Sequence, residues 1–189
     1  MYNVVNVCNF YIILIKMKGL FRMVDKKQRN LTKILFAAYF FILIWILLFK
    51  MSFSLDELYK DRSINLIPFL GSAIVNGKID TSEIINNIIV FIPVGIYICM
   101  LKENWSILKK ISVSFFISLS IEVLQFILAI GATDITDLIG NTLGGVIGIG
   151  IFYLFSKVFK NKTTSIVNIL ALISTIGLGS LISILLLIN

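Results

Sequence analysis

The stretch Ile111–Ile130 consists of apolar and weakly polar residues, and Glu122 is the one ionisable residue within it. A helix of this length extends about 30 Å at roughly 1.5 Å per residue, which matches the hydrocarbon thickness of a bilayer. An ionisable side chain at such depth costs roughly 2.5–3.5 kcal/mol on insertion scales, so it usually faces protein or water. The stretch therefore predicts a membrane-spanning helix whose carboxyl group faces inward.

The composition places the whole chain in the same class. Of its 189 residues, 58% are hydrophobic and 14% are charged, and the mean hydropathy is +0.99. Soluble domains carry about 25% charged residues. The net charge of +7 has no basic patch interleaved with aromatic residues, so no nucleic-acid partner is expected. The absence of histidine excludes histidine-based catalysis and the commonest zinc sites, and no cofactor is expected. Cys8 and Cys99 lie in apolar surroundings, so neither a disulfide nor a metal site is expected of them.

Five apolar runs predict an all-α, polytopic membrane bundle of about five transmembrane helices. The runs are Ile34–Phe49, Ile84–Leu101, Ile111–Ile130, Leu138–Phe155 and Ile166–Ile188. With the N-terminus inside, the cytoplasmic segments from Lys26 onward carry ten lysines and arginines, and the outer segments carry four beside seven acidic residues. The positive-inside rule therefore predicts a cytoplasmic N-terminus and an external C-terminus of a multi-pass cell-membrane protein.

The predicted domain organisation has three parts. Residues 1–30 form a short N-terminal segment, 31–160 the main membrane domain, and 161–189 a C-terminal transmembrane helix. The apolar run Tyr2–Ile15 is short for a span, so the true start of the chain can be Met1, Met17 or Met23.

Polar residues recur at helical spacing in three of the predicted helices. Ser114, Ser118, Glu122 and Gln125 step by four, four and three residues, so they share one face. This face is expected to point into the bundle. Asn87 lies near the outer start of the second predicted helix.

The fourth predicted helix begins with a similar pattern. Asp134, Asp137 and Asn141 step by three and four residues, and either Asp134 or Thr136 is a plausible N-cap. Gly140, Gly144 and Gly148 form a smooth face suited to close helix contact. By depth, all these carboxylates and amides fall in the outer half of the membrane or at its edge. They are therefore predicted to converge on a shared outward-facing pocket.

These same residues carry a resemblance to the VanZ-like family of bacterial integral membrane proteins, over roughly Asn65 to Phe155. The matching pieces are Asn65-Leu66-x-Pro68-Phe69, Asn87 with Phe91-x-Pro93-x-Gly95, Ser118-x-x-x-Glu122-x-x-Gln125, and Asp134-x-x-Asp137-x-x-x-Asn141-Thr142-x-Gly144. One departure is that Gly131-Ala132-Thr133 offers no arginine before the first aspartate, where many members have one. A role for that arginine in pairing with an anion therefore does not transfer to this chain.

The resemblance implies a contribution to tolerance of teicoplanin-type glycopeptide or lipoglycopeptide antibiotics. We favour a non-enzymatic action at the outer leaflet, with no catalytic residue assigned. The expected partners are membrane lipid and either a lipoglycopeptide antibiotic or a lipid-linked cell-wall intermediate, and the oligomeric state stays open. The alternative is a small intramembrane enzyme or transporter that acts on a lipid-linked substrate.

Two interpretations of the acidic residues also stay open. Glu122 either stabilises the bundle as a protonated acid bonded to Gln125, Ser118 or Asn87, or it lines an outward-open polar cavity. Asp134 and Asp137 either begin their helix or, with Glu122, hold a divalent cation that bridges to a phosphate-bearing lipid. The predicted ligand-binding or polar cluster comprises Asn65, Asn87, Glu122, Gln125, Asp134, Asp137 and Asn141.

Overall fold

Helices make up most of the protein in the computed structural model, which describes residues 26–48, 63–68, 74–75, 78–79, 81–130 and 133–188. The long helices are Lys26–Leu48, α2 (Ser82–Leu101), α3 (Ile107–Leu128), α4 (Ile135–Phe159) and α5 (Thr163–Ile188). A short 3-10 turn, η2 (Lys160–Lys162), separates α4 from α5.

The prediction of an all-α membrane bundle is confirmed. Four helical stretches of the described chain are long and apolar enough to cross a membrane, and the last of them, Ile135–Ser180, runs through α4 and η2 into α5. The number of crossings and their direction stay predictions. The N-terminal segment before Lys26, including Cys8 and the alternative starts, lies outside the described residues.

The helices extend beyond the apolar runs that predicted them. For example, α3 begins at Ile107 rather than Ile111, because Ser106 caps it by accepting a hydrogen bond from the backbone N–H of Lys109 at 3.4 Å. Hydropathy marks only the segment suited to lipid, whereas caps decide where a helix begins. The helix Lys26–Leu48 similarly starts in a lysine-rich segment.

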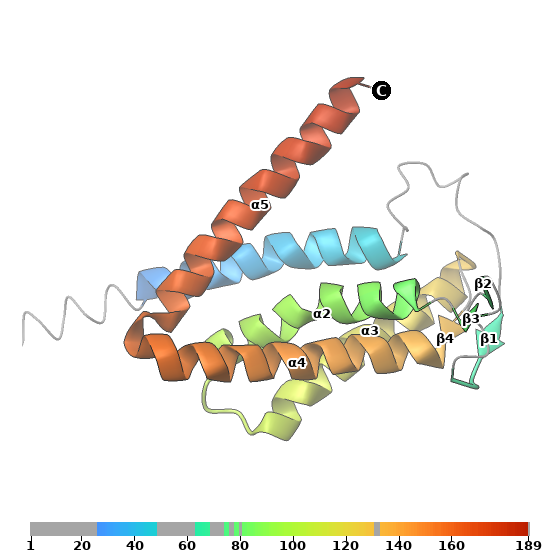
Figure 1. Cartoon of the computed structure of the whole chain (residues 1–189), viewed down its shortest axis with the longest axis horizontal. Coiled ribbons are helices and arrows are strands. Elements are labelled where there is room, and N and C mark those ends of the chain that lie inside the picture. Colours follow the sequence, from blue (N-terminus) through green and yellow to red (C-terminus); the bar gives the residue numbers. More distant parts are fainter. Residues whose placement is uncertain are drawn as a thin grey trace, which may run out of the picture.

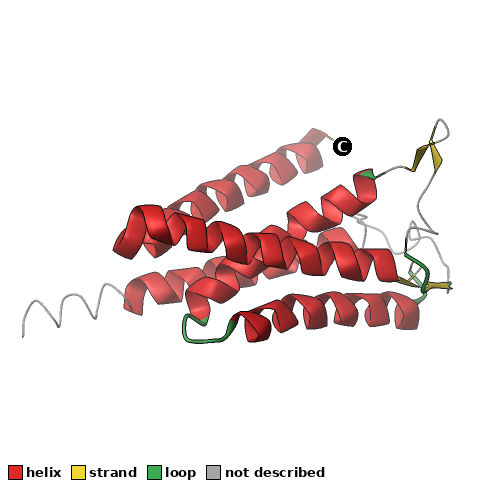
Figure 2. Cartoon of the chain, turned by 60° about the horizontal axis from the view of Figure 1, so that its bottom comes forward, coloured by secondary structure: helices red, strands yellow, loops and turns green. Residues whose placement is uncertain are grey.

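Short strands lie at one end of the bundle, as both views show (Figures 1 and 2). β1 (Ile64–Asn65) pairs in parallel with β4 (Thr133–Asp134), and β2 (Ile74–Val75) pairs antiparallel with β3 (Lys78–Ile79). We call this the strand end; α2 and α4 begin there and α3 finishes there (Figure 1). The opposite end, which holds Lys26, the α2–α3 turn and η2, is called the lysine end.

The described residues 63–68 of the loop before α2 are only partly covered by the bundle. Asn65 is half-buried within β1. The next two apolar residues are not covered, since Leu66 is 69% exposed and Ile67 60% exposed. In residues 63–68 the contact with the rest of the protein is made by the β1–β4 backbone pairing and by the side chain of Asn65, whereas Leu66 and Ile67 are exposed.

Glycines allow α4 to lie directly on the backbone of α2. A Cβ added at Gly144 would overlap the Ile88 carbonyl, and one at Gly148 would overlap the Ile92 carbonyl. On the α2 side, a Cβ at Gly95 would overlap the carbonyl of Gly145. The predicted close-contact face is therefore confirmed, and its partner is α2.

The apolar core lies between α2, α3 and the helix Lys26–Leu48. Its buried residues are Leu43, Phe91, Val94, Ile98 and Ile121. The hydroxyl of Tyr39 also donates a hydrogen bond to the carbonyl of Val90, close to Pro93 of α2. This bond ties the helix Lys26–Leu48 to the proline-containing part of α2, where the regular helical bonding is interrupted.

α5 is attached mainly through its first turns. The side chain of Asn168, fully buried, donates to the backbone carbonyl and to Oε1 of Gln28 and accepts from Thr32. Beyond this attachment α5 diverges from the other helices (Figure 1). An added Cβ at Gly177 or Gly179 would meet no atom within 4 Å.

The contact between α2 and α4 gives a direct test. We expect Gly148→Ala to destabilise the protein by roughly 1–3 kcal/mol, because the added methyl group must displace the backbone of α2. Gly150→Ala is the matched control, since a Cβ there meets no atom within 4 Å and alanine favours helix more than glycine. Thermal unfolding of the detergent-solubilised variants measures the difference. Equal midpoints for the two variants would contradict the contact.

Candidate functional site

The chain reverses at the strand end immediately after α3. Ala129 adopts a left-handed conformation (φ 55°), and its N–H bonds back to the carbonyls of Gln125 and Phe126. Thr133 then reaches the last turns of α3, because its hydroxyl donates to the carbonyl of Glu122 at 3.1 Å. The start of α4 is thereby held against the end of α3.

Asp134 is the residue at which three segments of the chain meet. One carboxylate oxygen accepts from the side-chain amide of Asn65 at 2.9 Å, and the other accepts from the backbone N–H of Thr136 at 2.7 Å. The backbone N–H of Asp134 donates to Oε2 of Glu122 at 3.0 Å. Asp134 is thus the N-cap of α4, which confirms one of the two predicted alternatives, Asp134 and Thr136.

A second amide–carboxylate pair joins α2 to α4. The side-chain amide of Asn87 donates to Oδ1 of Asp137 at 2.7 Å. Asn87 lies beside the glycine face, since an added Cβ at Gly140 would be 3.5 Å from the Cβ of Asn87. Asp137 is in the first turn of α4, where a negative charge is favoured by the helix dipole.

The predicted inward orientation of the polar face of α3 is confirmed. Ser114 and Ser118 have no exposed surface, Glu122 is 3% exposed and Gln125 is 5% exposed. Glu122 bonds to the backbone of Asp134, which is a partner that the sequence analysis did not name.

Two of the predicted site residues have other partners. Asn141 lies one helical turn deeper than Asp137 and donates to the hydroxyl of Ser118 at 2.9 Å. Gln125 donates to the carbonyl of Leu47 at 3.0 Å, so it secures the helix Lys26–Leu48. Gln125 and Asn141 therefore make their hydrogen bonds apart from those that join the other five residues, and the expectation that all seven share one pocket stays a prediction.

We refer to the remaining group as the strand-end cluster. It comprises Asn65, Asn87, Glu122, Asp134 and Asp137. Asn65, Asp134 and Asp137 are half-buried, whereas Asn87 and Glu122 are buried. Each carboxylate has acceptor capacity for several hydrogen bonds. The accessible layer of the cluster is therefore rich in acceptors and suits a ligand that carries ammonium, amide or hydroxyl donors.

The divalent-cation alternative for the acidic residues stays a prediction. In the described part of the chain, no group of three His, Cys, Asp or Glu side chains is placed to hold a metal ion. The carboxylate of Asp134 binds an amide and a backbone N–H, and that of Asp137 binds an amide. Both carboxylates form hydrogen-bonded pairs with asparagine amides from other segments of the chain.

The sequence analysis missed the residues that align the two loops. The backbone N–H of Thr133 donates to the carbonyl of Ser63 at 3.0 Å, and the parallel pairing sets Asn65 opposite Asp134. Two-residue strands have no detectable alternation, so no sequence pattern could have located them. The motifs at Asn65 and at Asp134 marked both loops but not the backbone pairing between them.

Comparison with known proteins gives two matches. The family model described as VanZ/LLP1 matches residues 36–156. The chain is also 38% identical to Protein VanZ of Enterococcus faecium over 134 residues, which cover 70% of this chain and 80% of that protein. The chain belongs to the VanZ/LLP1 family. No solved structure matches it.

The VanZ/LLP1 region contains the whole strand-end cluster and the glycine contact between α2 and α4. It begins within the helix Lys26–Leu48 and ends three residues before the end of α4, so α5 lies beyond it. The part of this VanZ/LLP1 protein that the family model matches is thus the part that builds the cluster.

The N-cap of α4 can be tested separately from any function. We expect Asp134→Ala to destabilise the protein by roughly 0.5–2 kcal/mol, because Thr136 loses its capping acceptor and Asn65 loses its partner. Asp134→Asn keeps an acceptor for one of the two bonds and should fall between the wild type and the alanine variant. Denaturant unfolding in mixed micelles measures the order of the three proteins. An alanine variant as stable as the wild type would contradict the proposed role of Asp134.

Proposed function

We propose that this protein is a multi-pass protein of the cell membrane that contributes to tolerance of teicoplanin-type glycopeptide antibiotics. In this proposal it acts without catalysis, by binding an amphiphile at the outer leaflet. Family membership supports the proposal, and the observation that carries it is the strand-end cluster.

The cluster concentrates polar groups at one membrane surface of a highly apolar protein. Four segments that are far apart in the sequence contribute to it: β1, α2, the end of α3, and β4 with the start of α4. The distribution of lysines and arginines supports the prediction that the strand end faces the outside of the cell. A glycopeptide carries peptide N–H groups and sugar hydroxyls, which are the donors that half-buried carboxylates accept.

The groups available in the cluster favour binding over catalysis. Its members are carboxylates and carboxamides, and the chain has no histidine to act as a general base near neutral pH. Both accessible carboxylates already accept hydrogen bonds from asparagine amides. Such pairs hold a surface in a fixed shape that an amphiphile can recognise.

The first test compares teicoplanin susceptibility of a sensitive host that expresses the wild type, Asp137→Ala or Asn86→Ala. We expect the wild type to raise the minimum inhibitory concentration and Asp137→Ala to return it to the empty-vector value. Asn86 adjoins Asn87 on α2 but is exposed, so Asn86→Ala should behave as the wild type. Each variant must reach the membrane at the wild-type level. Full protection by Asp137→Ala would contradict the proposal.

The exchange of the pair separates binding from stability. The double variant Asn87→Asp/Asp137→Asn keeps one amide and one carboxylate in contact, with their positions reversed. We expect the double variant to unfold at the temperature of the wild type but to give no teicoplanin tolerance. Its carboxylate then lies at position 87 of α2, which is buried, so it is not accessible to a ligand. Recovery of both properties would mean that the pair is structural only. Intact teicoplanin recovered from the cultures would support a non-enzymatic action, whereas a modified product would contradict it.

A further inference from the structure

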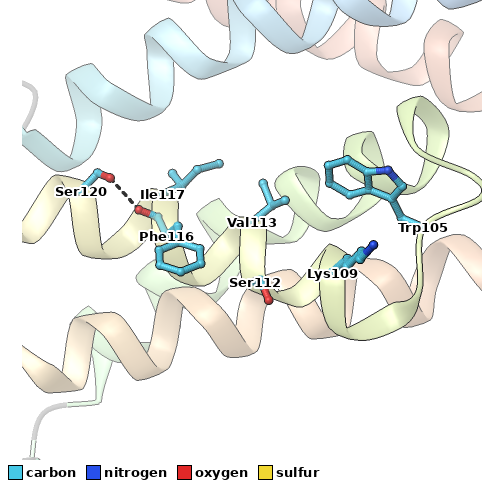
Figure 3. A pocket seen from close by; sticks show the side chains of 7 residues that line it. All are labelled: Trp105, Lys109, Ser112, Val113, Phe116, Ile117 and Ser120. Carbon is cyan, nitrogen blue, oxygen red and sulfur yellow. Dashed lines mark hydrogen bonds between the residues drawn. The ribbon is translucent and has the colours of Figure 1, made fainter.

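A groove runs along α3 on the lysine-end half of the bundle, away from the strand-end cluster (Figure 3). It has a volume of about 630 Å³, within the range of ~300–1,000 Å³ that is typical of small-ligand sites. All its lining residues come from α3 and the turn before it. Trp105 lies at one end of the row and Ser120 at the other (Figure 3).

The body of the groove is apolar. Val113 and Ile117 pack partly on the core and leave their outer surfaces in the groove, and Phe116 is 60% exposed beside them. The two serines of the groove use their hydroxyls within the helix. Ser112 donates to the carbonyl of Leu108 at 2.8 Å, and Ser120 donates to that of Phe116 at 2.7 Å. The groove thus suits a hydrocarbon chain.

The end of the groove at the α2–α3 turn is cationic and aromatic. Lys109 is exposed and lines the groove beside Trp105. The ammonium group of Lys102 lies over the ring of Trp105, 4.9 Å from its centroid. Glu103 is the acidic residue of this turn, beside Lys102 and Lys109. The ammonium group of Lys110 is buried and donates to the carbonyl of Glu103 and to the hydroxyl of Tyr153. Tryptophan and lysine are the side chains that anchor proteins at the level of lipid headgroups.

The length of the groove matches one leaflet. From Lys109 to Ser120 the helix rises roughly 16 Å at about 1.5 Å per residue. Half of the hydrocarbon core of a bilayer is about 15 Å. A lipid whose phosphate contacts Lys109 would therefore place its acyl chain along Val113, Ile117 and Phe116 and end near the midplane.

We propose that this groove is a binding site for an anionic phospholipid of the leaflet at the lysine end. The phosphate group lies beside Lys109 and Lys102, and one acyl chain follows α3 as far as Ser120. The positive charge of Lys109 and Lys102 favours an anionic over a zwitterionic lipid. The apolar residues of the groove favour a lipid over a free phosphate. The site is independent of the strand-end cluster and of any role in drug tolerance.

The test uses Trp105 as the reporter. In the variant Trp45→Phe, Trp105 is the remaining tryptophan of the chain. The full-length protein is placed in phosphatidylcholine nanodiscs that contain a small, equal share of either brominated phosphatidylglycerol or brominated phosphatidylcholine. We expect the brominated phosphatidylglycerol to quench Trp105 fluorescence more strongly. Soluble glycerol phosphate should not relieve this quenching, because it lacks acyl chains.

Two lysine variants complete the test. Lys109→Gln should reduce quenching by the brominated phosphatidylglycerol to the level of the zwitterionic lipid. Lys157→Gln is the matched control, because Lys157 is an exposed lysine near the end of α4 that does not line the groove, so it should leave the selectivity unchanged. Equal quenching by the two lipids would overturn the proposal, as would equal losses in both variants. Relief by glycerol phosphate would mean an anion site rather than a lipid site.

Discussion

The close contact between α2 and α4 fixes the alignment of the two helices that carry Asn87 and Asp137. Gly144 and Gly148 bring α4 onto the carbonyls of Ile88 and Ile92, and this approach leaves no freedom for one helix to slide along the other. Nearer the strand end, the same alignment allows the amide of Asn87 to donate to Asp137 at 2.7 Å. In lipid, where apolar burial contributes little to helix association, such packing and the hydrogen bonds that it permits are the main source of specificity.

Once α2 and α4 are aligned, the rest of the strand end follows from the need to satisfy buried polar groups. Glu122 is almost fully buried and accepts from the backbone of Asp134, whose own carboxylate caps α4 and binds Asn65. The hydrogen bonds of the cluster therefore stabilise the strand end, and the cluster also has an accessible surface. In the proposed function, the mutually bonded groups would hold the recognition surface in shape before a ligand arrives, which lowers the ordering cost of binding.

Much of this arrangement was predictable from the sequence, and the part that was not has identifiable causes. Helical spacing correctly placed the polar face of α3 inward, and the glycine face of α4 in a close contact, because both depend on a single helix. The partner of each face could not be predicted, since spacing within one helix carries no information about its neighbours. Gln125 shows the limit: it shares the face of Glu122 but binds the carbonyl of Leu47 on another helix. The β1–β4 pairing was missed because two residues are too few to form a pattern.

The central claim is that the loop before α2 and the loop before α4 meet at the strand end and set Asn65 against Asp134. Disulfide crosslinking in membranes tests it most directly, with Ile64→Cys and Thr133→Cys introduced at paired positions after Cys8 and Cys99 are replaced by serine. Adjacent strands bring the Cα atoms within the range of about 4.4–6.8 Å that a disulfide requires. The account predicts rapid crosslinking of this pair and none of Ile64→Cys with Phe159→Cys, which is at the far end of α4. Failure of the first pair to crosslink, or equal crosslinking of both pairs, would contradict it.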